Sequence, residues 1–121
     1  MRLDMELIRK IIFTLEDHEH GYAPSEMHIE GYTKEQIDYH AYQMMEFDLV
    51  EGVKTADYHS SSPQAIIKNL TWRGHEFAAA ARNETIWNKS QSIVKEKGGT
   101  ISIGVFTQLL TSIAKAHFGL P

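Results

Sequence analysis

The stretch GYTKEQIDYHAYQMMEFDLVEG, residues 31–52, decides the fold that this sequence predicts. Thr33 is a favourable residue for the N-cap of a helix, and Gln36, three residues later, completes the T-x-x-Q form of a capping box. Apolar residues then recur at helical spacing and give the helix one apolar face: Ile37, Ala41 and Met44. We therefore expect a helix over residues 33–47.

The residues after this helix predict a β-hairpin. Residues 49–55 and 64–70 have the pattern of strands, and the polar, turn-forming segment YHSSSP at 58–63 separates them. A capped helix of about four turns that ends in a tight turn before a hairpin is typical of a winged helix-turn-helix. The pattern therefore predicts a recognition-type helix at 33–47 and a wing at 49–70.

The chain before this stretch predicts one long helix and an irregular connection. Asp4 can cap a helix over residues 4–17. Its apolar stripe comprises Leu7, Ile8, Ile11, Ile12 and Leu15. Two glycines and a proline interrupt residues 18–31, where the alternation at 27–30 predicts a short strand. At most one helical turn fits around 24–26, so the first helix of an ordinary helix-turn-helix is reduced or absent.

The rest of the chain predicts further helices. Thr71 can cap a helix that the alanine-rich residues 78–82 extend, and residues 83–85 break or bend it. Gly98–Gly99 is a helix stop, and Ser102 can cap a last helix through to about His117. The fold class is therefore mainly α with a small β-hairpin (α+β). We expect a winged helix-turn-helix-like domain over 1–82 and a C-terminal helical extension over 83–121.

Composition bounds the class of protein. A chain of 121 residues, 42% hydrophobic and 23% charged, is typical of one globular domain. It contains no cysteine, which excludes disulfides and thiolate metal sites and favours a reducing, cytoplasmic location. The charged N-terminus lacks the apolar core of a signal peptide, and no apolar run is long enough to cross a bilayer.

Charge is distributed unevenly along the sequence. Residues 1–52 carry four basic and twelve acidic side chains, whereas residues 53–121 carry eight basic and four acidic ones. A protein that binds nucleic acid needs a basic binding face. Any such face must therefore draw on the second half of the chain.

Two motifs resemble those of small bacterial winged-helix regulators. Residues 37–52 read I-x-x-H-A-x-x-M-x-x-x-x-L-V-E-G, which is similar to the end of a recognition helix in these regulators. Residues 70–74 read L-T-x-x-G, which is similar to the segment after the wing in PadR-like and, more distantly, ArsR-like proteins. Here Phe47–Asp48 replaces the usual Ala-Gly at the helix end, where Asp48 can still adopt the left-handed turn.

Over its whole length the chain resembles an uncharacterised bacterial and phage family, domain of unknown function 2513. The marks of this resemblance are residues 2–9, LTWRGHEF at 70–77, TIW at 85–87 and KGG at 97–99. The resemblance implies a winged-helix-like fold and DNA binding. It carries no functional residues over to this chain.

The candidate DNA contacts lie on the predicted helix and wing. Side chains that could reach base edges or phosphates are Lys34, Tyr39, Gln43, Lys54, Lys68 and Arg73. Glu35 and Asp38 on the same helix would repel phosphates. The alternative interpretation is a solvated helix face that contacts protein or nothing.

No pattern predicts an enzyme, a metal site or a cofactor. Asp17–His20 is the one cluster of possible metal ligands, and we favour a solvated polar loop over a metal site there. His75–Glu76 begins like a zinc-protease motif, but position 79 is alanine. His40, beside the apolar stripe, fits a packed or capping role.

Two function hypotheses follow. The first is a small, prophage-derived DNA-binding transcriptional regulator that acts on double-stranded DNA as a homodimer. Its dimer interface would be the last helix, through Phe106, Leu109, Leu110 and Ile113, although this stripe could instead pack within the chain. The alternative is a protein-protein interaction module on a winged-helix scaffold, without DNA binding, whose acidic helix meets a basic protein partner.

Overall fold

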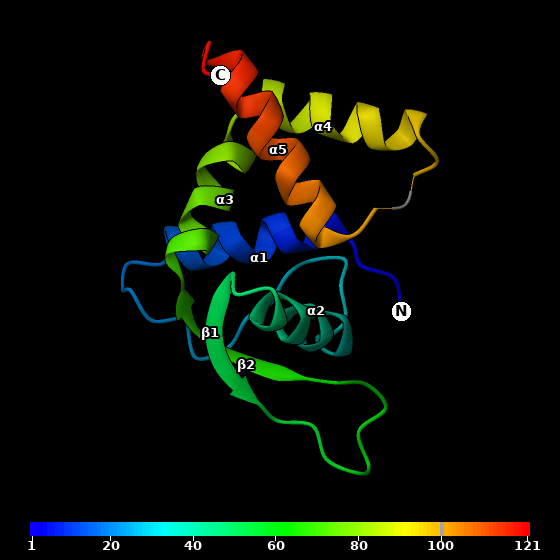
Figure 1. Cartoon of the computed structure of the whole chain (residues 1–121). Helices are drawn as coiled ribbons and strands as arrows, with labels where there is room; N and C mark the ends of the chain where they lie inside the picture. Colours follow the sequence, from blue (N-terminus) through cyan, green and yellow to red (C-terminus); the bar gives the residue numbers. More distant parts are fainter. Residues whose placement is uncertain (100) are drawn as a thin grey trace. The chain divides into compact units, whose positions relative to one another are not determined.

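The computed structural model, drawn in Figure 1, describes residues 1–99 and 101–121. These residues divide into two compact units, 1–75 and 76–121. The division falls within a helix, before the boundary that the sequence predicted after residue 82. The elements, in chain order, are α1 (Met5–Asp17), α2 (Lys34–Glu46), β1 (Val50–Lys54), β2 (Ala65–Leu70), α3 (Trp72–Arg82), α4 (Glu84–Glu96) and α5 (Ile103–His117). This arrangement confirms the prediction of a mainly helical fold with one small hairpin.

Helix α1 forms the predicted core helix of the first unit. The Asp4 carboxylate accepts hydrogen bonds from the backbone N–H groups of Glu6 at 2.9 Å and Leu7 at 3.2 Å. These bonds satisfy two of the N–H groups that a helix start leaves without partners. The buried face is Met5, Leu7, Ile8, Ile11, Ile12 and Leu15.

Helix α2 has the predicted capping box. The Thr33 hydroxyl accepts the N–H of Gln36 at 3.1 Å, and the Gln36 side chain accepts the N–H of Thr33 at 2.8 Å. The helix ends at Glu46 with Phe47 as its C-cap, and Asp48 then adopts the left-handed region with φ 64°. The N–H of Leu49 then bonds the Met44 carbonyl at 2.8 Å, so the chain turns directly into β1.

The hairpin pairs β1 and β2 antiparallel, with a bulge. Val53 lies opposite Ile66 and Glu51 opposite Asn69, but Lys68 has no partner on β1. Gly52 beside the bulge has no room for a side chain, because a Cβ there would lie 2.3 Å from the Ile66 carbonyl oxygen. The strands are slightly shorter than the predicted 49–55 and 64–70.

The L-T-x-x-G motif ties the start of α3 to the end of α2. The Thr71 hydroxyl donates to the Asp48 carbonyl at 2.6 Å and accepts the N–H of Gly74 at 3.1 Å. The Thr71 N–H also donates to the Leu49 carbonyl at 3.1 Å. A Cβ at Gly74 would lie 2.2 Å from the Leu49 carbonyl oxygen. The motif thus has a structural role that its resemblance to regulators did not reveal.

The predicted strand at 27–30 is wrong. Ile29 is buried between exposed neighbours, as the alternation required, but residues 27–29 form no ladder. The Tyr32 N–H bonds the Ile29 carbonyl at 3.2 Å, and Gly31 has a φ of 89°, so the backbone turns instead of extending. The single helical turn considered at 24–26 is also absent.

The second unit packs three aromatic side chains from its three helical segments. The Trp87 ring of α4 lies 6.3 Å from Phe77 of α3 and 5.3 Å from Phe106 of α5, both edge to face. Asn83 caps α4 through the N–H of Ile86, and the predicted Ser102 cap of α5 is present. Within 1–99 and 101–121, no helix combines the length and apolar character needed to cross a membrane.

Candidate functional site

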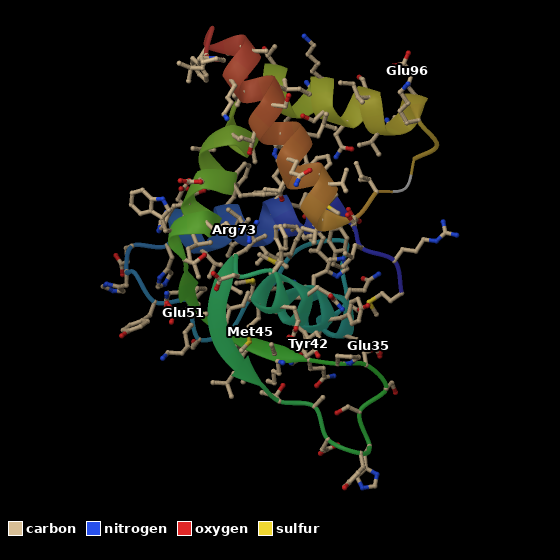
Figure 2. The ribbon with its side chains drawn as sticks, in the orientation of Figure 1. Glu35, Tyr42, Met45, Glu51, Arg73 and Glu96 are labelled. Atoms are coloured by element: carbon tan, nitrogen blue, oxygen red, sulfur yellow. The ribbon has the colours of Figure 1, made fainter. Side chains whose placement is uncertain are left out.

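The outward side of α2 carries two carboxylates and two phenol rings. Glu35, Tyr39, Tyr42 and Glu46 follow one another at spacings of four, three and four residues, opposite the buried side of the helix. Figure 2 shows Glu35 and Tyr42 on the same side of α2. We call these four residues the acidic ridge. In the DNA-binding hypothesis this ridge would enter the groove, and it contains no cation.

Lys34, the first candidate for a phosphate contact, pairs within its own helix. Its ammonium contacts the Asp38 carboxylate, one turn further along. The Lys34 side chain is 87% exposed and that of Asp38 is 18% exposed, so the pair lies at the surface. The lysine therefore adds no net positive charge to this part of α2.

Lys54, the second candidate, pairs with one end of the acidic ridge. Its Nζ lies 2.5 Å from Glu46 Oε1 and 5.2 Å from the centre of the Tyr42 ring. The hydrogen bond between the two side chains, with their opposite charges, lowers the pKa of the Glu46 carboxyl and raises that of the Lys54 ammonium. The Lys54 ammonium of the hairpin is therefore already engaged by a carboxylate of α2.

Arg73, the third basic candidate, covers the end of α2. Its guanidinium lies 4.0 Å from the centre of the Phe47 ring, and Nη1 donates to the Phe47 carbonyl at 3.3 Å. A cation at this position also meets the negative end of the helix dipole. These contacts with Phe47 give Arg73 a structural role that does not require a bound nucleic acid.

The other DNA-binding candidates are dispersed. Tyr39 and Gln43 lie one turn apart on α2 and are half-buried. Lys68 is exposed on β2, and in the described ranges it has no ion pair or ring contact. Lys68 is therefore the one basic candidate in these ranges whose charge is not already engaged.

His40 links the two helices of the first unit. Only 2% of it is exposed; its Nε2 accepts the Asp4 N–H at 2.9 Å, and its Nδ1–H donates to the Gln36 carbonyl at 2.7 Å. Burial lowers the pKa of His40 because it disfavours the charged ring. Protonation would also place an N–H on Nε2 against the N–H of Asp4. The predicted packed or capping role describes this geometry.

His40 makes the stability of the first unit depend on pH. Because its folded-state pKa lies below the ordinary value of about 6.5, the unfolded chain takes up the proton first as the pH falls. Stability is therefore fully present above pH ~6.5 and declines towards the lower folded-state pKa. We expect the free energy of unfolding to fall less between pH ~7.5 and ~5.5 in His40→Gln than in the parent. The control is His28→Gln, at an exposed site, which should show the same change of unfolding free energy with pH as the parent. If His40→Gln also showed the parental pH dependence, the role of His40 would be contradicted.

The first unit contains a cavity that no sequence pattern predicted. A cavity of about 440 Å³ lies between α2, β2 and residues 23–28. Its apolar lining includes Pro24, Met27, Ile37, Ala41, Ala65 and Ile67. These residues are separated in the sequence and ordinary for a core, so no motif could have identified them.

Two further groups of residues considered in the sequence are the Asp17–His20 cluster and the apolar stripe of the last helix. His20 Nε2 lies 3.2 Å from Glu19, but among the residues that the structure describes, no three His, Asp or Glu side chains are arranged to hold a metal ion. In α5, Phe106, Leu110 and Ile113 are buried within the single chain, and Leu109 is half-buried. The stripe therefore packs internally; a dimer through it stays a prediction.

Comparison with known proteins identifies relatives. A family described as "Hypothetical protein (DUF2513)" matches residues 2–100. A protein of Haemophilus influenzae described as "Uncharacterized protein" is 30% identical over 117 residues, which cover 93% of this chain and 95% of that protein. No solved structure matches the chain, and the resemblance to winged-helix regulators is not confirmed.

Proposed function

This chain belongs to the DUF2513 family, and we propose that its first unit is a protein-interaction module that binds a basic partner through the acidic ridge. The observation that supports this proposal is the ridge itself, with the exposed Glu35 at one end and, at the other, Glu46, whose carboxylate already pairs with Lys54. A phosphate backbone would meet repulsion there, whereas lysine or arginine side chains of a protein would meet opposite charge.

The charge of the whole unit favours the same class of partner. Residues 1–75 contain seven basic and thirteen acidic side chains, a net charge of −6. Lys34 and Lys54 each pair with one carboxylate of α2, so these two ion pairs leave the net charge of −6 unchanged. The long-range field of this unit therefore attracts cationic surfaces and disfavours the approach of DNA.

The two tyrosines of the ridge provide aromatic surface that a partner's cationic side chains could contact. Tyr39 and Tyr42 are half-buried, so each presents part of its ring at the surface. Tyrosine is enriched in protein interfaces, and a cation over its ring is attracted to the negative face. Lys54 above the Tyr42 ring is an example within this chain. A partner's lysine or arginine could bind the ridge in the same manner.

Charge reversal on the ridge tests the proposal. We expect the double variant Glu35→Lys, Glu46→Lys to bind a fluorescent lysine-rich peptide about tenfold more weakly, since each exposed ion pair contributes about 0.2–1 kcal/mol and reversal adds repulsion. The control is Glu30→Lys, Glu96→Lys, which makes the same change of net charge at exposed positions outside the ridge. Equal losses in both double variants would show that only overall charge matters and would contradict the ridge.

A DNA-binding transcriptional regulator is the second candidate, favoured by the exposed Lys68 on a hairpin that follows a capped helix. Under this candidate, Lys68→Glu should weaken binding to mixed-sequence duplex DNA and reduce its salt dependence by about one phosphate contact. Lys89→Glu, an exposed position on α4, is the control. Duplex binding that survives Lys54→Glu combined with Lys68→Glu would exclude the hairpin as the phosphate-binding element.

A further inference from the structure

The irregular segment 23–29 is anchored at both ends, although it forms neither a helix nor a strand. At its start, the Ala23 N–H donates to the Lys68 carbonyl of β2 at 2.7 Å. Just beyond its end, the Tyr32 hydroxyl donates to the Asp4 carboxylate at 3.0 Å. The segment is therefore held in place, and the cavity that it encloses with α2 and β2 is a built feature of the first unit.

The size and lining of this cavity are those of a site for a small molecule. Its volume of about 440 Å³ lies within the range of about 300–1,000 Å³ that is typical of small-ligand pockets. Most of the lining is apolar and comes from α2 and β2, with Ile37, Ala41 and Ile67 among its members. Small-ligand pockets combine such an apolar lining with a few polar groups that orient the ligand.

The charged groups of the lining carry a net negative charge. Among the described residues these groups are Glu26, Asp38 and Lys34. The Lys34 ammonium binds Asp38 through Oδ2, and within the described ranges Asp38 Oδ1 accepts no hydrogen bond. In the same ranges the Glu26 carboxylate has no ion pair or hydrogen bond. The cavity therefore offers two carboxylates to a cation and contains one cation of its own.

Asp38 is the recessed member of its ion pair. Its side chain is 18% exposed, whereas that of Lys34 is 87% exposed. An ion pair at the surface contributes little to stability, so a ligand's cation can join or replace the Lys34 ammonium at Asp38 with little loss. A carboxylate that is partly removed from water also attracts a cation more strongly than one in bulk solvent.

We propose that the cavity binds a small organic amine, with its apolar body between α2 and β2 and its ammonium group beside Asp38 and Glu26. Burial of the apolar body would provide binding free energy, and the two carboxylates would select a cation over a neutral or anionic ligand. None of the four residues of the acidic ridge lines the cavity. The inference therefore goes beyond the proposed function and does not rest on it.

The test is an NMR titration of the whole chain, labelled at its methionine methyl groups, with three probes that share one apolar body: phenylbutylamine, phenylbutanol and phenylbutyrate. We expect a bound probe to shift the methyl signal of Met27, which lines the cavity, and not that of Met45, which lies on α2 outside the lining. We expect the amine to bind about tenfold more tightly than the alcohol, and the acid most weakly, because charge-assisted hydrogen bonds are the stronger ones.

Two double variants separate the charge of the cavity from the charge of the whole chain. Glu26→Gln with Asp38→Asn preserves the shape of both side chains and should remove the preference for the amine over the alcohol. The control, Glu30→Gln with Asp48→Asn, makes the same changes at exposed positions outside the lining and should retain that preference. Equal affinity of the parent for amine and alcohol, equal amine binding by both double variants, or no Met27 shift with any probe would each overturn the inference.

Discussion

Gly74→Ala is expected to lower the free energy of unfolding of the first unit by about 2–3 kcal/mol, the upper part of the range for overpacked sites. The added Cβ would lie 2.2 Å from the Leu49 carbonyl oxygen, a backbone atom that cannot rotate away. Moving α3 aside would lengthen the hydrogen bonds that Thr71 makes to Asp48 and Leu49. Urea unfolding followed by circular dichroism would measure the loss.

The control for this variant is Gly21→Ala. Gly21 has open space around its Cβ position and no left-handed φ. Its replacement should leave the stability unchanged within about 0.5 kcal/mol, or raise it slightly by restricting the unfolded chain. Equal stabilities for the two variants would contradict the close approach of α3 to the end of α2.

Trp87→Ala is expected to cost about 3–5 kcal/mol in the second unit, the range for removing a large aromatic side chain from a core. Trp87 is 2% exposed and contacts Phe77 and Phe106 edge to face. Its loss would leave a cavity between the helices of this unit. Thermal unfolding would report it as a lowered midpoint.

Trp72→Ala provides the comparison, because Trp72 is 81% exposed. Its removal should change the stability by less than about 1 kcal/mol. A Trp87→Ala protein as stable as Trp72→Ala would show that the aromatic cluster does not hold the second unit together.

Local signals predicted most of the helices. The caps at Asp4, Thr33 and Ser102 depend on residues three or fewer positions away, so the sequence alone contains them. The left-handed turn at Asp48 was likewise predicted from the helix end. The strand predicted at 27–30 failed because side-chain alternation does not reveal whether a partner strand lies alongside.

The contacts of the candidate site join residues far apart in the sequence, so the spacing of residues along the chain could not predict them. The pairing of Lys54 with Glu46 and the stacking of Arg73 on Phe47 join different elements. These contacts engage basic side chains that were predicted to contact phosphates. Only the Lys34–Asp38 pair, one helical turn apart, had a spacing from which it could have been foreseen. The cavity beside β2 likewise exists only once residues 23–28 lie against the hairpin.

The measurement that tests the central claim most directly compares two probes over one salt series. Fluorescence anisotropy would follow binding of the whole chain to a lysine-rich peptide and to mixed-sequence duplex DNA. An acidic interaction face predicts peptide binding that weakens as salt rises, with no duplex binding even at low salt. Duplex binding that falls steeply with salt, together with no binding of the peptide, would contradict it, because the slope would count phosphate contacts that the acidic ridge should prevent.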